Sequence, residues 1–143
     1  MFDDLVHPRI GVEFDWLGTD ASGRVAFFSS AGYGAVPLAA ASWASEADAA
    51  LDRIGSWPTR GSFIDESDGH GDFTVWFDVA ARGFYAYDWK HWAGPYVRVA
   101  SPTDPLDIGE LPPEVRSAAW LVTLPQSFTN APTLDAPRAE RAP

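Results

Sequence analysis

A short run of the chain, residues 65–72, brings four carboxylates and one histidine together between glycines and a serine. Carboxylate oxygens are the ligands that Ca²⁺ and Mg²⁺ prefer. A calcium-binding loop, however, needs acids at alternate positions, a central glycine and a distal bidentate glutamate, and this run has a different order. We therefore interpret the run as a solvated acidic loop that can meet a basic protein surface, and we predict no metal site.

Histidine and glycine patterns give little catalytic chemistry. His7, His70 and His91 lie far apart, and neither a His-Glu-x-x-His zinc spacing nor a Gly-x-Ser-x-Gly nucleophile turn occurs. His91 follows Asp88 closely enough to form a base-orienting pair, although a surface histidine on a hairpin is the more common outcome. The segment 32–34, Gly-Tyr-Gly, lacks the third glycine of a dinucleotide-binding turn. We predict that the chain is not an enzyme and has neither catalytic residues nor a cofactor.

Composition indicates a folded acidic domain. The chain has 143 residues, 20 acidic and 10 basic side chains, and an aromatic content of 14% that includes seven tryptophans. Disordered acidic segments are poor in aromatic residues, so the charge here is expected on the surface of a packed domain. Such a surface repels nucleic acid and anionic membranes and attracts basic proteins. We therefore predict a basic protein partner, and neither a nucleic acid nor a membrane.

The sequence also bears on the cellular compartment. Cysteine is absent, so the fold does not depend on an oxidising environment. The first residues are acidic where a signal peptide would be basic, and no apolar run approaches the roughly 20 residues of a membrane helix. We expect a cytoplasmic protein.

Hydrophobic periodicity predicts two antiparallel hairpins. Residues 12–17 alternate apolar with acidic side chains, and residues 24–29 follow a turn-forming Thr-Asp-Ala-Ser-Gly segment. Residues 84–89 alternate in the same way, and residues 96–100 are their natural antiparallel partner. A final strand is expected at residues 120–124.

Helix signals lie between and after the hairpins. Ser45 can cap a helix that ends near Gly55, with Asp48 and Asp52 on its exposed face. A second helix is expected to begin at an Asp72 cap and end at Gly83, with a buried stripe formed by Val75, Trp76, Val79 and Ala80. The Pro112-Pro113-Glu114 segment resembles the first turn of a short third helix.

These elements predict the fold class. We expect an α+β fold with a mainly antiparallel sheet of four to five strands and two to three helices. Residues 1–130 are expected to form a single domain. Residues 131–143 are rich in alanine and proline, and we predict that they form a disordered tail.

Aromatic residues fall into two groups. Those inside apolar patterns are expected in the core, namely Trp16, Phe27, Trp76, Phe84 and Trp120. Those beside glycine or proline are either exposed anchors for a partner or lids on the core, namely Tyr33, Trp57, Trp92 and Tyr96.

Three segments carry a resemblance to small bacterial proteins: the opening hairpin at residues 14–37, the segment Ala80–Trp89 and the segment Pro95–Pro102. Their shared motifs are structural, namely a hairpin turn, a helix terminator and a strand. In size and acidity the chain is similar to immunity proteins of polymorphic toxin systems, which bind and block a cognate toxin. The resemblance implies a protein-binding inhibitor and brings no catalytic residues with it.

Acidic side chains concentrate between residues 44 and 80, where the sequence has eight acidic residues and only two arginines. We therefore expect an immunity-type protein that neutralises a basic toxin through an acidic surface with tryptophan anchors. The predicted contact residues are Glu46, Asp48, Asp52, Trp57, Asp65, Glu66, Asp68, Asp72 and Trp92. The alternative is a small-molecule or carbohydrate-binding domain, in which Tyr85, Tyr87 and Trp89 form an aromatic platform on one sheet face.

Overall fold

The computed structural model describes residues 5–6, 14–31, 36–37, 40, 44–89 and 94–134. These residues form a single α+β domain built on a mixed seven-stranded sheet. Along the sheet the strand order is β5-β7-β6-β3-β2-β8, and β9 also pairs with β7. The strands are β2 (Asp15–Asp20), β3 (Val25–Ser29), β5 (Phe63–Asp65), β6 (Tyr85–Trp89), β7 (Tyr96–Pro102), β8 (Thr123–Leu124) and β9 (Thr133–Leu134).

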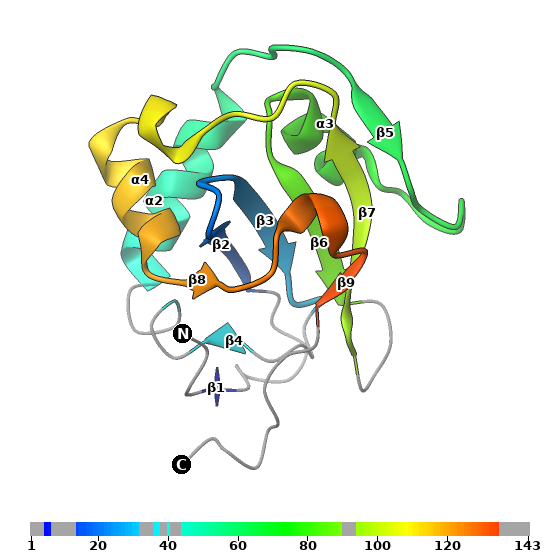
Figure 1. The fold of residues 1–143 in the computed structure, drawn as a ribbon, viewed down its shortest axis with the longest axis horizontal. Coiled ribbons are helices and arrows are strands. Elements are labelled where there is room, and N and C mark those ends of the chain that lie inside the picture. Colours follow the sequence, from blue (N-terminus) through cyan, green and yellow to red (C-terminus); the bar gives the residue numbers. More distant parts are fainter. Residues whose placement is uncertain are drawn as a thin grey trace.

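The three α-helices and η1 cover one face of this sheet, and η2 lies over the other. The α-helices are α2 (Ala44–Gly55), α3 (Thr74–Ala81) and α4 (Pro113–Trp120), and the 3₁₀ helices are η1 (Ile108–Glu110) and η2 (Phe128–Asn130). Figure 1 shows α2 and α4 side by side at one end of the sheet, with α3 behind β6 and β7. A separate two-stranded sheet pairs β1 (Leu5–Val6) with β4 (Val36–Pro37).

The sheet separates two hydrophobic cores, because successive side chains of a strand point to opposite faces. On the helix face, Leu17 and Phe27 pack against residues of α2, α3 and α4 such as Ile54 and Val115. On the other face, aromatic rings pack beneath η2 and β9, with Phe128 at their centre. Both cores contain side chains from strands of the same sheet, so the sheet joins them in one domain.

Both predicted hairpins are confirmed. β2 pairs antiparallel with β3, and β6 pairs antiparallel with β7. The expectation of a mainly antiparallel sheet of four to five strands is partly wrong, because β3 pairs with β6 and β2 pairs with β8 in parallel. The long connection from β3 to β6 contains α2 and α3, which gives the chain the length that a parallel crossover needs. The additional strands are two or three residues long, too short for alternation to reveal them.

The predicted helix after residue 44 is confirmed, with a small shift of its start. α2 begins at Ala44, so Ser45 lies in its first turn rather than before it. Ala50 and Ile54 are buried, while Asp48 and Asp52 are exposed. Amphipathic spacing was therefore a sufficient signal for the orientation of this helix.

α3 is also confirmed, but its start and its buried stripe differ from the prediction. The cap position is Phe73 rather than Asp72, and no side chain caps the helix. Asp72 Oδ1 accepts hydrogen bonds from the Thr74 amide (3.0 Å) and hydroxyl (2.6 Å) at the start of the helix. Val79 and Ala80 are buried as expected, whereas Val75 is 57% exposed. Phe73 takes part in the packing instead, with its ring 5.4 Å from that of Trp76.

The predicted strand at residues 120–124 is wrong for its first residues. Trp120 is the last residue of α4, and only Thr123 and Leu124 form a strand. Trp120 was expected in the core but is 56% exposed, and the Arg116 guanidinium lies 5.8 Å from its ring centre. Pro113 near the start of α4 favours the helix, which continues for two turns to Trp120.

The aromatic side chains on one face of β6 are buried in the core. Tyr85, Tyr87 and Trp89 are 5%, 0% and 7% exposed, so they form no open platform and the carbohydrate-binding alternative loses its basis. Phe28 stacks on Tyr87 with ring centres 5.0 Å apart, and the Tyr87 hydroxyl donates to the carbonyl of Ala131 at 2.7 Å. These rings are core residues.

The loop-side aromatics are distributed differently from the prediction. Tyr96 is 1% exposed and its hydroxyl accepts a 3.2 Å hydrogen bond from Trp16 Nε1, so it is a core residue. Tyr33 and Trp92, together with His91, lie outside the described residues. Trp57 is half-buried and packs at the edge of the helix-side core.

The packed part of the domain extends past the predicted boundary at residue 130. Ala131 and Leu134 are buried, and β9 pairs antiparallel with Tyr96 and Val97 of β7. Residues 135–143 of the predicted tail lie outside the described residues. Among the described residues, no helix has the length and apolar character needed to cross a membrane.

Candidate partner-binding surface

Most of the large apolar side chains that the described residues leave exposed lie in one short segment. Phe63 and Ile64 of β5 are 37% and 51% exposed, and Val75 of α3 is 57% exposed. We call this segment the β5 edge surface and define it as Phe63, Ile64, Asp65, Asp68, Asp72 and Val75. It includes both faces of the β5 edge, because Ile64 points to the face opposite to Phe63. Figure 1 shows β5 as the outermost strand on one side, followed by a loop that turns back toward α3.

Phe63 is held in place by α3. Its ring stacks on that of Phe77 with ring centres 4.5 Å apart and planes 7° from parallel. Phe77 in turn lies 6.3 Å from the ring of Phe73. This row of rings fixes β5 against the helix, so Phe63 presents its exposed edge from a rigid support.

The acids of this surface are oriented by short local hydrogen bonds. Asp65 Oδ1 accepts from the Ser67 amide (2.8 Å) and hydroxyl (2.7 Å). Asp68 Oδ1 accepts from the His70 amide at 2.9 Å. All three acids of the surface are exposed. Among the described residues, neither Asp65 nor Asp72 forms an ion pair, so both present a full negative charge to solvent.

The charge of Asp72 is reinforced by Thr74. Hydrogen bonds from the Thr74 hydroxyl and then from its amide lower the pKa of Asp72 below its ordinary value of 3.8. Donors that favour the ionised form of a carboxyl make it a stronger acid. Asp72 therefore keeps its negative charge throughout the neutral and mildly acidic range.

Glu66 does not belong to this surface, although the sequence placed it there. Its Oε1 accepts a 2.8 Å hydrogen bond from Arg98 Nε, and its Oε2 accepts a 2.6 Å hydrogen bond from the Ser101 hydroxyl. The Arg98 and Glu66 side chains are only 13% and 25% exposed. Glu66 is thus neutralised inside the fold and attaches the start of the acidic loop to β7.

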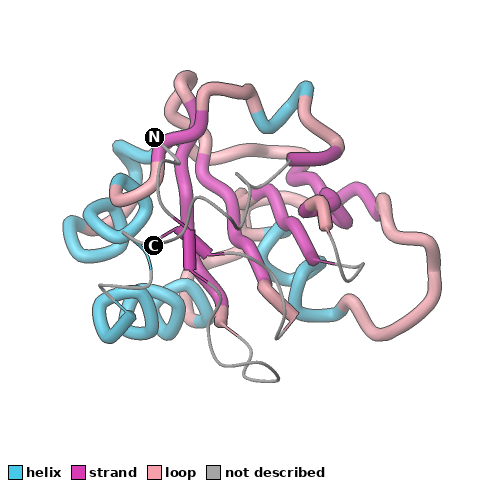
Figure 2. The backbone as a smooth tube through the Cα atoms, turned by 90° about the horizontal axis from the view of Figure 1, so that it is seen from below, coloured by secondary structure: helices cyan, strands magenta, loops and turns pink. Residues whose placement is uncertain are grey.

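The acids of α2 lie elsewhere. Glu46, Asp48 and Asp52 are exposed on α2, as predicted. Figures 1 and 2 place α2 and the acidic loop that follows β5 toward opposite ends of the longest axis of the molecule. The structure therefore does not bring the predicted contact residues together into one acidic patch.

The predicted tryptophan anchors do not complete such a patch. The Trp57 carbonyl accepts a 2.6 Å hydrogen bond from Arg82 Nε, which attaches the end of α2 to the end of α3. Trp92 lies outside the described residues. The apolar part of the β5 edge surface was missed by pattern analysis, although Phe63 and Ile64 beside a run of acids were a visible signal.

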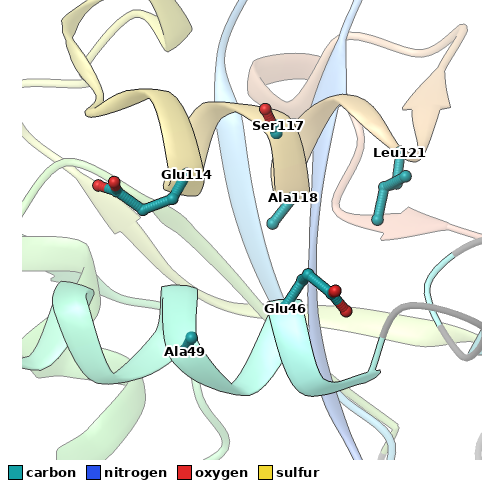
Figure 3. A pocket seen from close by; sticks show the side chains of 6 residues that line it. All are labelled: Glu46, Ala49, Glu114, Ser117, Ala118 and Leu121. Atoms are coloured by element: carbon teal, nitrogen blue, oxygen red, sulfur yellow. The ribbon is translucent and has the colours of Figure 1, made fainter.

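A hollow lies between α2 and α4 (Figure 3). Its volume is about 350 Å³, and its lining residues are Glu46, Ala49, Glu114, Ser117, Ala118 and Leu121. The Glu114 carboxylate pairs with Arg53 at 2.8 Å, so the charge at that rim is compensated. The groove is apolar and small, and Glu46 is the only predicted contact residue in it.

The described residues contain no cluster of three or more His, Asp or Glu side chains that could hold a metal ion. Comparison of the chain with models of protein families, with curated proteins and with solved structures found no match. The exposed surfaces and their charge are therefore the features that bear on function.

Proposed function

We propose that this chain is a protein-binding inhibitor of the immunity type, which neutralises a basic bacterial toxin through the β5 edge surface. One observation carries the proposal. Three exposed apolar side chains, Phe63, Ile64 and Val75, lie in the same segment as three exposed carboxylates. Exposed apolar groups beside charged ones are typical of surfaces that bind proteins.

The two kinds of side chain have different roles in this proposal. The carboxylates of Asp65, Asp68 and Asp72, together with a net charge of −10, attract a basic partner and speed its approach. The apolar side chains lose water on contact and supply most of the binding free energy. Phe63 loses little conformational entropy on binding, because Phe77 already holds its ring.

Features of the sequence also support the proposed immunity role. In size and acidity the chain is similar to bacterial immunity proteins, and its hairpin segments resemble small bacterial proteins. Many toxins that act on nucleic acids have cationic substrate sites, which an acidic inhibitor can occupy. No enzyme activity is proposed.

The experiment begins by reading the gene beside this chain's gene, where the proposal expects a basic toxin domain and where its absence would count against the immunity role. The two proteins are then co-expressed, and growth and the association rate against salt are measured. We expect the chain to restore growth, and we expect association to slow steeply as salt rises. The surface variant is Asp65→Lys with Asp68→Lys. Asp72 is left unchanged because its carboxylate accepts hydrogen bonds from Thr74 at the start of α3, and Glu66 because it holds Arg98.

The matched control is Asp48→Lys with Asp52→Lys, which makes the same change in net charge on α2. The surface variant should weaken binding about tenfold or more, and the control should have a much smaller effect. Equal weakening by both variants would mean that only the overall field matters. Unchanged binding of the surface variant, or failure to restore growth, would contradict the proposal.

A further inference from the structure

β5 uses only one of its two edges. The Ser62 carbonyl accepts a hydrogen bond from the Thr103 amide (3.2 Å), and the Glu66 amide donates to the Val99 carbonyl (2.9 Å). In an antiparallel ladder the residues that bond to a given neighbour alternate along the strand. Ile64 therefore faces β7, while the backbone N–H and C=O groups of Phe63 and Asp65 point away from the sheet.

These outward groups have no hydrogen-bond partner among the described residues, and no other described strand pairs with β5. Figure 1 agrees, since β5 is the last strand on its side and the following loop turns away toward α3. An edge of this kind is a template to which an extended segment of another chain can be added.

The side chains along the edge select the occupant. Phe63 and Asp65 are two residues apart and share the face on which α3 lies, while Ile64 points to the opposite face. A lysine or arginine of the added strand opposite Asp65 would be a favourable cross-strand pair. A second copy of this chain would instead carry the same net charge of −10, which opposes its approach.

We infer that the basic partner binds by adding an extended segment to β5 as a further strand of the sheet. The segment alternates basic residues, which lie on the α3 side near Asp65, with apolar residues, which lie near Ile64. This inference rests on the proposed function and adds the mode of binding to it.

The test uses the full chain and a synthetic probe, a nine-residue peptide of alternating lysine and valine with blocked ends. Two derivatives carry N-methyl groups, on the lysine amides in one and on the valine amides in the other. N-methylation removes a donor without changing side-chain charge. In an antiparallel addition the lysines opposite Phe63 and Asp65 direct their amides to β5, so lysine methylation should weaken binding about tenfold or more and valine methylation should not.

In a parallel addition the valine amides would point to β5 instead. Weaker binding of one derivative alone, whichever it is, therefore supports strand addition. Amide hydrogen exchange gives a second readout. The peptide should slow exchange of the Phe63 and Asp65 amides, which face away from β7. No binding of the parent peptide, or equal binding of all three peptides, would overturn the inference.

A pair of chain variants completes the test. Phe63→Ala removes the ring but keeps the outward amide, while Phe63→Pro also removes that amide, at an edge position where proline is tolerated. Strand addition predicts that Phe63→Pro binds the peptide several-fold more weakly than Phe63→Ala. If the two bind equally while Asp65→Lys with Asp68→Lys still abolishes binding, the partner contacts side chains alone, and the proposed function stands without strand addition.

Discussion

The carboxylate of Glu66 and the guanidinium of Arg98 meet at 2.8 Å between Oε1 and Nε, and this contact divides the acidic run into a structural and an exposed part. Arg98 also donates from Nη1 to the carbonyls of Phe128 and Thr129. One arginine therefore links the acidic loop, β7 and the segment that covers the aromatic core. Asp65 and Asp68 on either side of Glu66 in sequence remain exposed.

Glu66→Ala should destabilise the fold, because Arg98 and Ser101 would lose their acceptor in a partly buried site. We expect a loss of about 1–3 kcal/mol in the free energy of unfolding, measured by urea denaturation. Asp65→Asn is the control, since its amide oxygen can still accept from Ser67 and the site is exposed. A Glu66→Ala protein as stable as this control would show that the contact is not structural.

Replacement by alanine should affect stability differently at two glycines. Gly83 ends the helical region with φ of +107°, and an added Cβ would lie 2.9 Å from Arg60 Cδ and 3.1 Å from Leu106 Cβ. Gly83→Ala should cost about 1–3 kcal/mol of stability. Gly55, the last residue of α2, has open space around its Cα, so Gly55→Ala should be neutral or stabilise by up to about 1 kcal/mol. Thermal unfolding of both variants checks this contrast.

Two tryptophans should differ sharply in their contribution to stability. Trp16 is fully buried and stacks on Phe28 with ring centres 4.0 Å apart, so Trp16→Ala should cost about 3–5 kcal/mol. Trp120 is half-exposed at the end of α4, and its replacement by alanine should change stability by less than about 1 kcal/mol. Loss of fluorescence quenching by iodide in Trp120→Ala would confirm its exposure, whereas an unchanged quenching curve would contradict it.

Alkaline pH should unfold the protein through its buried tyrosines. Burial raises the pKa of Tyr87 and of Tyr96 above the ordinary value of 10.0. The unfolded chain therefore loses these protons first, and the associated stability, complete below pH 10, falls as pH rises above it. Phenolate absorbance of both residues should appear together with unfolding. Tyr96→Phe should reduce the amplitude of that step, and ionisation of Tyr87 without unfolding would contradict the argument.

Sequence patterns were informative where the chain repeats a period over several residues. The alternation before Trp16 and around Tyr87 predicted both long hairpins, and the spacing of Ala50 and Ile54 predicted the orientation of α2. β5 and β9 have three and two residues, so no period can reveal them. They form because longer strands provide a ladder to join, which is a tertiary effect.

The candidate surface was predicted only in part for a related reason. Asp65, Asp68 and Asp72 were found because charge is visible in any sequence. The exclusion of Glu66 depends on Arg98, which lies 32 residues further along the chain, and such a pairing has no local signal. The separation of the α2 acids from the loop acids depends on the topology of the sheet, which net charge cannot express.

During synthesis, β9 can join the sheet only after all the other described strands have been made. The outer side of β7 is shared by β5, opposite Ala100 to Pro102, and by β9, opposite Tyr96 and Val97. β9 is the last of the described strands to leave the ribosome, and Leu134 closes the aromatic core beside it. Until then half of that side is open to pairing with other chains. Stalled translation or proteolysis before Thr133 would therefore release a chain whose net charge is unchanged but which is prone to aggregate.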